Sequence, residues 1–337
     1  MSLIFKFVRR QARFRAPLLA SLFLPLVSCN NSDLLDSTTD SEVADGAPTS
    51  EPETEPSFAS AYAGGIPFGT FRLPTYEFGS RYNGAMRNIY PEHLLRELRA
   101  IKARGGKVVL MFVGHEKYFK HRGHFSLTKW KARVDRFRKV NFSSYIKDGT
   151  IIGHYLIDEP NDPANWGRRP VPPAMLEEMA KYSKRFWPGM VTIVRARPEY
   201  LVNYRGNYRY LDAAWAQYSY HRWPNTREFI NSNVAKARSK GLALIVGLNV
   251  INGGSRRHSA MTANQVRTFG SALLESSYPC AFISWQYRDY YMKNRGVQQA
   301  MADLRNKARN RGFKTCRGGG RAGGGGDDDD RGRDDDD

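Results

Sequence analysis

The feature that most limits the fold of this chain is a regular alternation of two patterns between residues 61 and 316. Short apolar runs alternate with segments that have the periodicity of amphipathic helices. Several runs are almost continuously apolar, which is typical of parallel strands covered on both faces. The alternation favours an α/β fold with a parallel sheet. The predicted strands span 67–73, 107–114, 150–157, 190–196, 212–220, 242–250 and 281–287.

The segments between these runs carry helix start and stop signals. The first begins with Pro91, which suits a first helical turn, and it is followed by Gly105 and Gly106, which stop a helix. The six predicted helices span 91–104, 128–146, 172–186, 225–240, 262–276 and 297–310.

Two arrangements of a parallel sheet fit this order. An open nucleotide-binding sheet would carry a G-x-G-x-x-G or phosphate-loop motif, and neither is present. A (β/α)8-type TIM barrel of about 250 residues fits the span 61–316 better, and we predict that fold. Because only seven strands are clear, we expect one strand to be irregular, within 76–90 or 196–211, or missing.

Charge is spread unevenly along the chain. Residues 1–30 hold five basic and no acidic residues, 31–60 hold eight acidic and no basic residues, and 317–337 hold four Arg and eight Asp. By difference, 61–316 holds 43 basic and 17 acidic residues, a net charge of +26. A domain with this charge would attract polyanions, although the same charge would also serve solubility.

The first 29 residues have the layout of an export signal. A basic segment precedes the apolar stretch 16–27, which is shorter than the about 20 residues that a membrane span needs. The next letters, "LVSC", resemble the lipobox of bacterial lipoproteins. That resemblance implies a mature chain that begins at lipid-modified Cys29, with an ordinary signal peptide as the alternative. Asn30, in place of Asp, favours the outer membrane or the cell surface of a bacterial envelope.

Two low-complexity segments flank the predicted barrel domain. Residues 30–60 are rich in Ser, Thr, Asp, Glu and Pro, so they cannot bury enough apolar surface to fold, and we predict a disordered tether. Residues 317–337 consist almost entirely of Gly, Asp and Arg, and we predict a solvated tail.

Acidic side chains stand where the strand 150–157 ends, as Asp158 and Glu159, directly before Pro160. In a barrel of this type the strand ends and the following loops form the active face. The candidate catalytic residues on that face are Glu159, Asp158, Glu199 and Asp289. The candidate substrate-binding residues are Arg72, His115, Glu116, Tyr218, Asn249, Trp285 and Gln286.

Two of these strand ends resemble those of TIM-barrel glycoside hydrolases. "GHYLIDEP" resembles the Asn-Glu-Pro or Asp-Glu-Pro motif that holds the acid/base Glu, and "FISWQY" resembles the last barrel strand, whose Trp lines the sugar site. The resemblance implies that Glu159 is the proton donor. Asp158 stands where the best-known clan has Asn, and neither "LALIVGLNVIN" nor "FISWQYR" supplies the second Glu of that family.

Cleavage of a glycosidic bond commonly uses two carboxyl groups, one protonated and one ionised. Neighbours on a regular strand point to opposite faces, so Asp158 and Glu159 both enter the barrel only if the strand end bulges. Asp158 would then raise the pKa of Glu159 by charge repulsion, or bind a sugar hydroxyl. We expect the partner carboxylate to be Glu199 or Asp289, with Glu116 as a third choice. In the alternative, Asp158 caps the following loop and Glu159 pairs with an arginine.

Three classes of function remain open. They are a hydrolase of polysaccharides, an inactive barrel that binds glycans, and a basic binder of polyanions. For the hydrolase, the positive charge of 61–316 favours an acidic polysaccharide as the substrate. The sequence contains no nucleic-acid motif, and the histidines around His115 match no zinc spacing. We therefore expect that the protein needs no metal or cofactor and does not bind nucleic acid. We also expect a monomer that binds carbohydrate.

The chain also offers one pair of cysteines for a disulfide bond. Cys280 precedes the last predicted strand and Cys316 follows the last predicted helix, so both belong to the same end of the barrel. Export permits oxidation. We predict a bond between them.

Overall fold

The computed structural model describes residues 65–319, and in them eight parallel strands close a barrel. The order around the barrel is β1-β2-β3-β6-β7-β8-β9-β10, and β10 pairs with β1. The predicted (β/α)8 TIM barrel is confirmed. The strands are β1 Phe68–Phe71, β2 Gly84–Asn88, β3 Lys107–Met111, β6 Ile151–Asp158, β7 Thr192–Arg195, β8 Ala213–Tyr218, β9 Ala243–Leu248 and β10 Ala281–Ser284.

The eighth strand is β2, inside the interval 76–90 where one was expected. It pairs in parallel with β1 and β3. The sequence does not show it as a strand because it contains a glycine, an arginine and an asparagine in five residues. Gly84 is required there, since a Cβ atom would lie 2.7 Å from the backbone nitrogen of Phe68.

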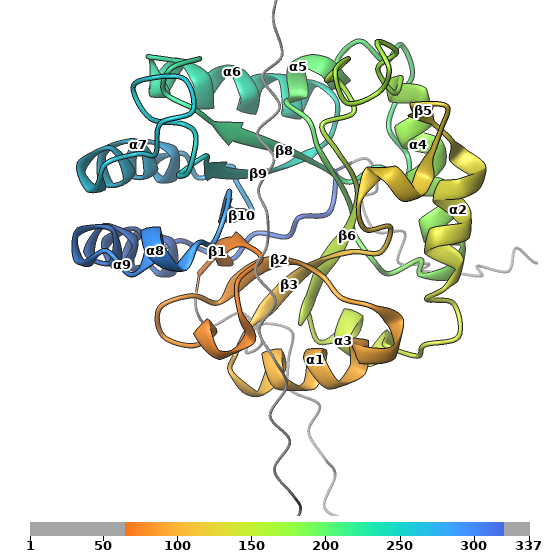
Figure 1. The fold of residues 1–337 in the computed structure, drawn as a ribbon, viewed down its shortest axis with the longest axis horizontal. Coiled ribbons are helices and arrows are strands. Elements are labelled where there is room, and N and C mark those ends of the chain that lie inside the picture. Colours follow the sequence, from red (N-terminus) through yellow and green to blue (C-terminus); the bar gives the residue numbers. More distant parts are fainter. Residues whose placement is uncertain (1–64, 320–337) are drawn as a thin grey trace, which may run out of the picture. The chain divides into compact units, whose positions relative to one another are not determined.

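The helices surround the strands, as Figure 1 shows. Where one helix was predicted over 128–146, the structure has two, because the chain leaves the helical conformation after Asp135 and resumes it at Ser143. Between β1 and β2 the chain forms only a 3₁₀ turn, Thr75–Glu77. The helices are α1 Pro91–Ala103, α2 Leu127–Asp135, α3 Ser143–Lys147, α4 Pro173–Phe186, α5 Pro198–Leu201, α6 Thr226–Ser239, α7 Ala263–Glu275, α8 Asp289–Met292 and α9 Arg295–Arg309.

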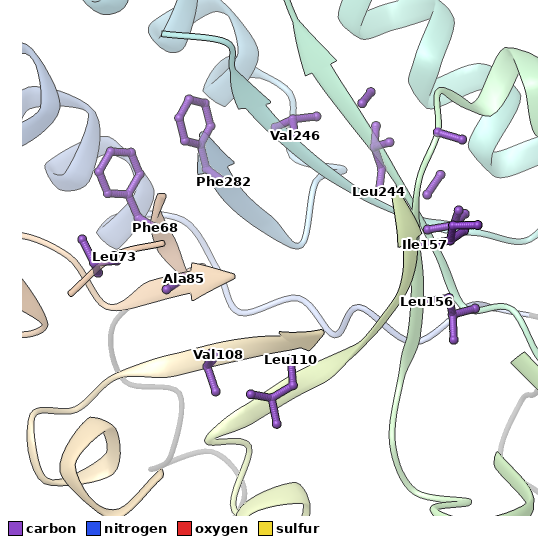
Figure 2. Close-up of a cluster of buried hydrophobic side chains, with 14 of the residues drawn as sticks. Phe68, Leu73, Ala85, Val108, Leu110, Leu156, Ile157, Leu244, Val246 and Phe282 are labelled. Atoms are coloured by element: carbon purple, nitrogen blue, oxygen red, sulfur yellow. The ribbon is translucent and has the colours of Figure 1, made fainter. Parts of the chain in front are cut away.

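The hydrophobic core has two layers, one on each side of the strands. The larger layer lies between strands and helices, where side chains such as Phe68, Leu110 and Val246 project away from the barrel centre (Figure 2). The smaller layer fills the barrel, with Phe71 and Tyr155 packed against Trp215 at ring-centroid distances of 4.6 and 5.7 Å. The barrel is therefore a filled core, and a ligand can enter only at its ends.

A covalent bond lies at the end of the barrel at which the strands begin. Cys280 and Cys316 form the predicted disulfide, with their Cα atoms 5.2 Å apart. Next to the bond lies a cavity of about 360 Å³, lined partly by Lys107, Phe313 and Arg317. This cavity is at the opposite end from the predicted carboxylates.

Several predictions concern residues outside the described range. They are the signal peptide 1–29 with Cys29, the tether 30–60, and most of the tail 317–337. Among residues 65–319, no helix combines the length and apolar character needed to cross a bilayer.

Candidate active site

The end of β6 contains a bulge that turns Asp158 into the barrel. Tyr155 pairs with Ile193 and Asp158 pairs with Arg195, so β6 advances three residues while β7 advances two. One extra residue in a strand shifts the alternation of side chains. As a result Tyr155 faces inward, whereas Leu156 and Ile157 both pack in the outer layer, as Figure 2 shows.

Glu159 follows in a left-handed conformation, with a φ angle of +39°. This conformation is unfavourable for a residue with a Cβ atom, so the surrounding structure must hold it. The indole nitrogen of Trp166 donates a hydrogen bond of 2.9 Å to the carbonyl oxygen of Glu159. The two backbone irregularities together aim neighbouring carboxylates at the same space.

That space is occupied by the guanidinium of Arg195, at the end of β7. Its Nε donates to Asp158 Oδ1, and its Nη2 lies 3.2 Å from Glu159 Oε1. Tyr155 donates a further hydrogen bond of 2.8 Å to Asp158 Oδ1. The Arg195 side chain is only 8% exposed, and a buried guanidinium is stable only when it is paired and hydrogen-bonded in this way.

Aromatic rings support the same guanidinium. The carbon at the centre of the Arg195 guanidinium lies 5.0 Å from the ring centroid of Trp285 and 5.7 Å from that of Phe71. Trp285 follows β10 directly and is partly exposed. One part of its ring system therefore borders the mouth of the barrel, which is the end at which the strands finish. Cation–π contacts of this kind strengthen when they are shielded from water.

Glu159 differs from Asp158 in exposure. Its side chain is 40% exposed, against 18% for Asp158, so Glu159 is the carboxylate that a ligand can reach. Burial raises the pKa of Glu159; Arg195 opposes the increase, and the charges of Asp158 and Asp162 add to it. Glu159 therefore stays protonated to a higher pH than an ordinary glutamate.

Two polar side chains inside the barrel have no hydrogen-bond partner among the described residues. They are the indole nitrogen of Trp215 and both amide atoms of Gln217, on β8. Trp215 belongs to the interior layer, and alternation along the strand directs Gln217 to the same side. Gln217 is opposite Gly247 of β9, which has no side chain to pair with it. Gln217 is not among the predicted site residues, although the alternation in "AAWAQY" places it two residues beyond the inward Trp215.

The carboxylates expected to partner Glu159 lie elsewhere on the mouth. Each is engaged by a cation of its own loop: Glu199 by Arg197 at 2.6 Å, and Asp289 by Lys293 at 3.0 Å. Both side chains are about half exposed. The structure records no contact of either with Glu159, so it does not bring the expected pair together.

Glu116 and His115 form a local contact after β3. Glu116 Oε2 lies 3.5 Å from His115 Nδ1, and the same nitrogen accepts a hydrogen bond from the backbone of Lys117. Among residues 65–319 no group of three or more His, Cys, Asp or Glu side chains could hold a metal ion.

One predicted ligand residue, Tyr218, does not lie at the mouth of the barrel. It is fully buried in the outer layer, where its ring packs against Phe229 of α6 and Phe269 of α7. Its hydroxyl donates to the carbonyl oxygen of Trp223 and accepts from Thr226. Tyr218 has no access to the mouth. It lies three residues after Trp215 on β8, so its side chain points to the opposite side of the sheet.

The remaining predicted ligands do lie at strand ends around the mouth. Arg72 is exposed directly after β1, and Asn249 is partly buried after β9, where it caps the turn to Asn252. Gln286 is buried, and in the amide orientation that satisfies both its ends it accepts from Arg288 at 2.8 and 3.1 Å. Gln286 thus orients Arg288, and its oxygen is not free for a sugar hydroxyl.

No protein-family model matches this sequence, and no curated protein matches it. Similar solved structures include a clostridial cellulose synthase subunit Z from Clostridioides difficile, 11% identical over 70% of this chain and 99% of that chain, with a TM-score of 0.48. A family 39 glycoside hydrolase from Bacteroides cellulosilyticus is 11% identical over 74% of this chain and 65% of that chain, with a TM-score of 0.47. An exo-β-1,4-mannosidase from an Opitutaceae bacterium is 13% identical over 72% and 59%, with a TM-score of 0.48. At these values the similarities say nothing about the reaction, which must be argued from the site.

Proposed function

We propose that this protein hydrolyses glycosidic bonds in a polysaccharide or glycoconjugate, with Glu159 as the general acid. One observation carries the proposal: a partly exposed glutamate with a raised pKa lies at the mouth of a (β/α)8 barrel, beside a partly exposed tryptophan. A general acid must be protonated near the working pH and must reach the leaving oxygen. Glu159 meets both requirements, because its pKa is raised and its side chain is partly exposed.

The neighbouring side chains have supporting roles in this proposal. Arg195 and Asp158 are positioning residues that hold the Glu159 carboxyl in place. Trp285 offers an apolar ring face for a sugar. The proton passes from the Glu159 carboxyl to the glycosidic oxygen as the bond to the anomeric carbon breaks. A water oxygen then bonds to the anomeric carbon, and a proton of that water returns to the Glu159 carboxylate.

A second candidate function is favoured by one specific observation. Glu199 and Asp289 are each paired with a cation of their own loop, so the second carboxylate of a hydrolase is not assembled beside Glu159. A barrel with one available carboxylate would bind a glycan without cleaving it.

Turnover on a panel of polysaccharides distinguishes the two candidates. Glu159→Gln nearly keeps the side-chain volume but cannot donate a proton, so kcat should fall by about 10²–10⁴-fold with little change in KM. Glu228→Gln, on the outer helix α6, is the matched control and should keep full activity. Glu199→Gln and Asp289→Asn test for the second carboxylate. Full activity of Glu159→Gln would refute the hydrolase, whereas binding without any turnover by the wild-type chain would favour the glycan-binding barrel.

We also propose that the protein is exported and anchored in a bacterial envelope by a lipid on Cys29. The support is the sequence order of basic segment, apolar stretch and "LVSC". Mass spectrometry of membrane-extracted protein should find a lipid on Cys29, and Cys29→Ser should release the protein. An unmodified N-terminus at another residue would refute the anchor.

A further inference from the structure

Three exposed arginines border the candidate active site without a carboxylate partner. Arg72 follows β1, Arg222 lies in the loop after β8, and Arg288 lies in the loop after β10. Two other cations on this face are neutralised, Arg197 by Glu199 and Lys293 by Asp289. Among residues 65–319, no ion pair joins Arg72, Arg222 or Arg288 to an acidic side chain.

Each of the three is tied to the site by a separate observation. Arg222 lies exposed in the loop after β8, and its charge lowers the pKa of Glu159. Arg72 is adjacent to Phe71, whose ring contacts Arg195, and its φ angle of +56° turns the chain at the mouth. Arg288 is oriented by the buried amide of Gln286.

The charges inside the site do not cancel these three. Arg195 is neutralised by Asp158, so the inner group is neutral when Glu159 is protonated and carries one negative charge when Glu159 is ionised. Asp162, whose charge raises the pKa of Glu159, adds one negative charge, and with Arg72, Arg222 and Arg288 counted as well this group stays net positive in both states. A neutral glycan would leave these three positive charges without a counter-charge, whereas anionic groups spaced along a chain would pair with them.

We infer that the sugar chain bound at this mouth is anionic, carrying carboxylate or sulfate groups that pair with Arg72, Arg222 and Arg288. The inference rests on the proposed function, because it names the chemical class of the glycan for the same site. Guanidinium groups suit both anions, since their planar donors bind two oxygens at once. Uronic acids and sulfate esters are therefore the two sources to compare.

Binding is measured with the full chain carrying Glu159→Gln, so that no polymer is consumed. The probes are polygalacturonate, chondroitin sulfate, and polygalacturonate whose carboxyl groups have been reduced to alcohols. The reduced polymer keeps the backbone of the first probe and removes only its charge. We expect one or both acidic polymers to bind at least about tenfold more tightly than the reduced one, and the stronger of the two identifies the anion.

Charge-matched variants then locate the binding. Arg72→Gln and Arg222→Gln should each weaken binding of the acidic polymer by about tenfold. Arg227→Gln is the control, because it removes the same charge from α6, where Arg227 pairs with Glu275. Equal binding of charged and reduced polymers would overturn the inference, and so would an equal loss in Arg227→Gln and Arg222→Gln.

The two proposals fail in different ways. If the acidic polymer binds through Arg72 and Arg222 but wild-type protein never cleaves it, the hydrolase proposal fails and the anionic ligand stands. If wild-type protein cleaves a neutral glycan with no dependence on these arginines, the anionic ligand fails and the hydrolase proposal stands.

Discussion

His154 should make the stability of this protein fall steeply in mild acid. The residue lies on β6 with its ring fully buried in the outer layer, next to Phe112 at a ring-centroid distance of 4.3 Å. One ring nitrogen, Nδ1, lies 2.8 Å from the hydroxyl of Ser183, and the other has no hydrogen-bond partner among the described residues. A proton added to this ring would place a positive charge in an apolar layer.

Burial lowers the pKa of His154 from an ordinary 6.5 to about 3. Between these values the unfolded chain binds a proton that the folded chain does not, so stability present above pH 6.5 is lost as the pH falls toward 3. At pH 4 the unfolded histidine is protonated about 300 times more often than not, which corresponds to a loss of about 3 kcal/mol relative to pH 7. The typical stability of a domain is only about 5–15 kcal/mol.

Urea unfolding at pH 7, 5.5 and 4 measures this effect. His154→Gln removes the titrating group, so the variant should lose about 3 kcal/mol less than the wild type between pH 7 and pH 4, whatever its stability at pH 7. His121→Gln, at an exposed position on the two-residue strand β4 (Lys120–His121), removes a histidine that is not buried and is the matched control. The reasoning is refuted if wild type and His154→Gln lose the same free energy over this range.

Three further perturbations test other parts of the structure. Because the pKa of Glu159 is raised, the basic limb of a plot of kcat/KM against pH should lie above the ordinary glutamate pKa of about 4.3. Arg222→Gln should move this limb to higher pH, because it removes a positive charge that lowers the pKa of Glu159. An unmoved limb would count against Glu159 as the acid. Cys316→Ser opens a link across 36 residues and should lower the free energy of unfolding by about 3–4 kcal/mol, and an unchanged urea midpoint would contradict this. Arg195→Met leaves Asp158 buried without a cation and should cost about 3–5 kcal/mol, part of which Asp158→Asn should restore in the double variant; purely additive losses would argue against the pair.

The fold could be predicted because its strands are buried on both faces. A strand such as β9, Ala243–Leu248, has six buried residues in succession, and this gives a continuous apolar run in the sequence. The strand β2 gives no such signal in the sequence, because two of its five residues, Arg87 and Asn88, are polar. In the structure the Arg87 side chain pairs with Glu97 of α1, and Asn88 is exposed. A short strand can be held by backbone pairing to its two neighbours with few apolar side chains of its own.

The site was less predictable, because it depends on which way each side chain points. Tyr218 and Gln217 are adjacent on β8, and the predicted ligand residue, Tyr218, is the one that faces outward. For the expected second carboxylates, the sequence does contain a sign that they are already paired. Arg197 is two residues from Glu199, and Lys293 is four residues from Asp289. An acidic residue with a cation so close in sequence readily pairs within its own loop. The bulge in β6, by contrast, leaves no signal in the residue pattern.

The bulge explains why two carboxylates stand side by side at the end of β6. A single glutamate paired with Arg195 would leave a buried guanidinium without a counter-ion each time it took up a proton, and that state would be strongly disfavoured. Asp158 removes this difficulty, because it neutralises Arg195 from below while Tyr155 donates to the same carboxylate oxygen. Glu159 is then free to gain and lose a proton at the mouth without disturbing the pair beneath it. The left-handed conformation of Glu159 is the cost of placing it over the guanidinium, about 1–2 kcal/mol for such a residue. The end of β6 therefore combines a strained Glu159 with a second carboxylate, Asp158, that keeps Arg195 neutralised. This arrangement allows Glu159 to change its protonation state, which is what the proposed reaction requires.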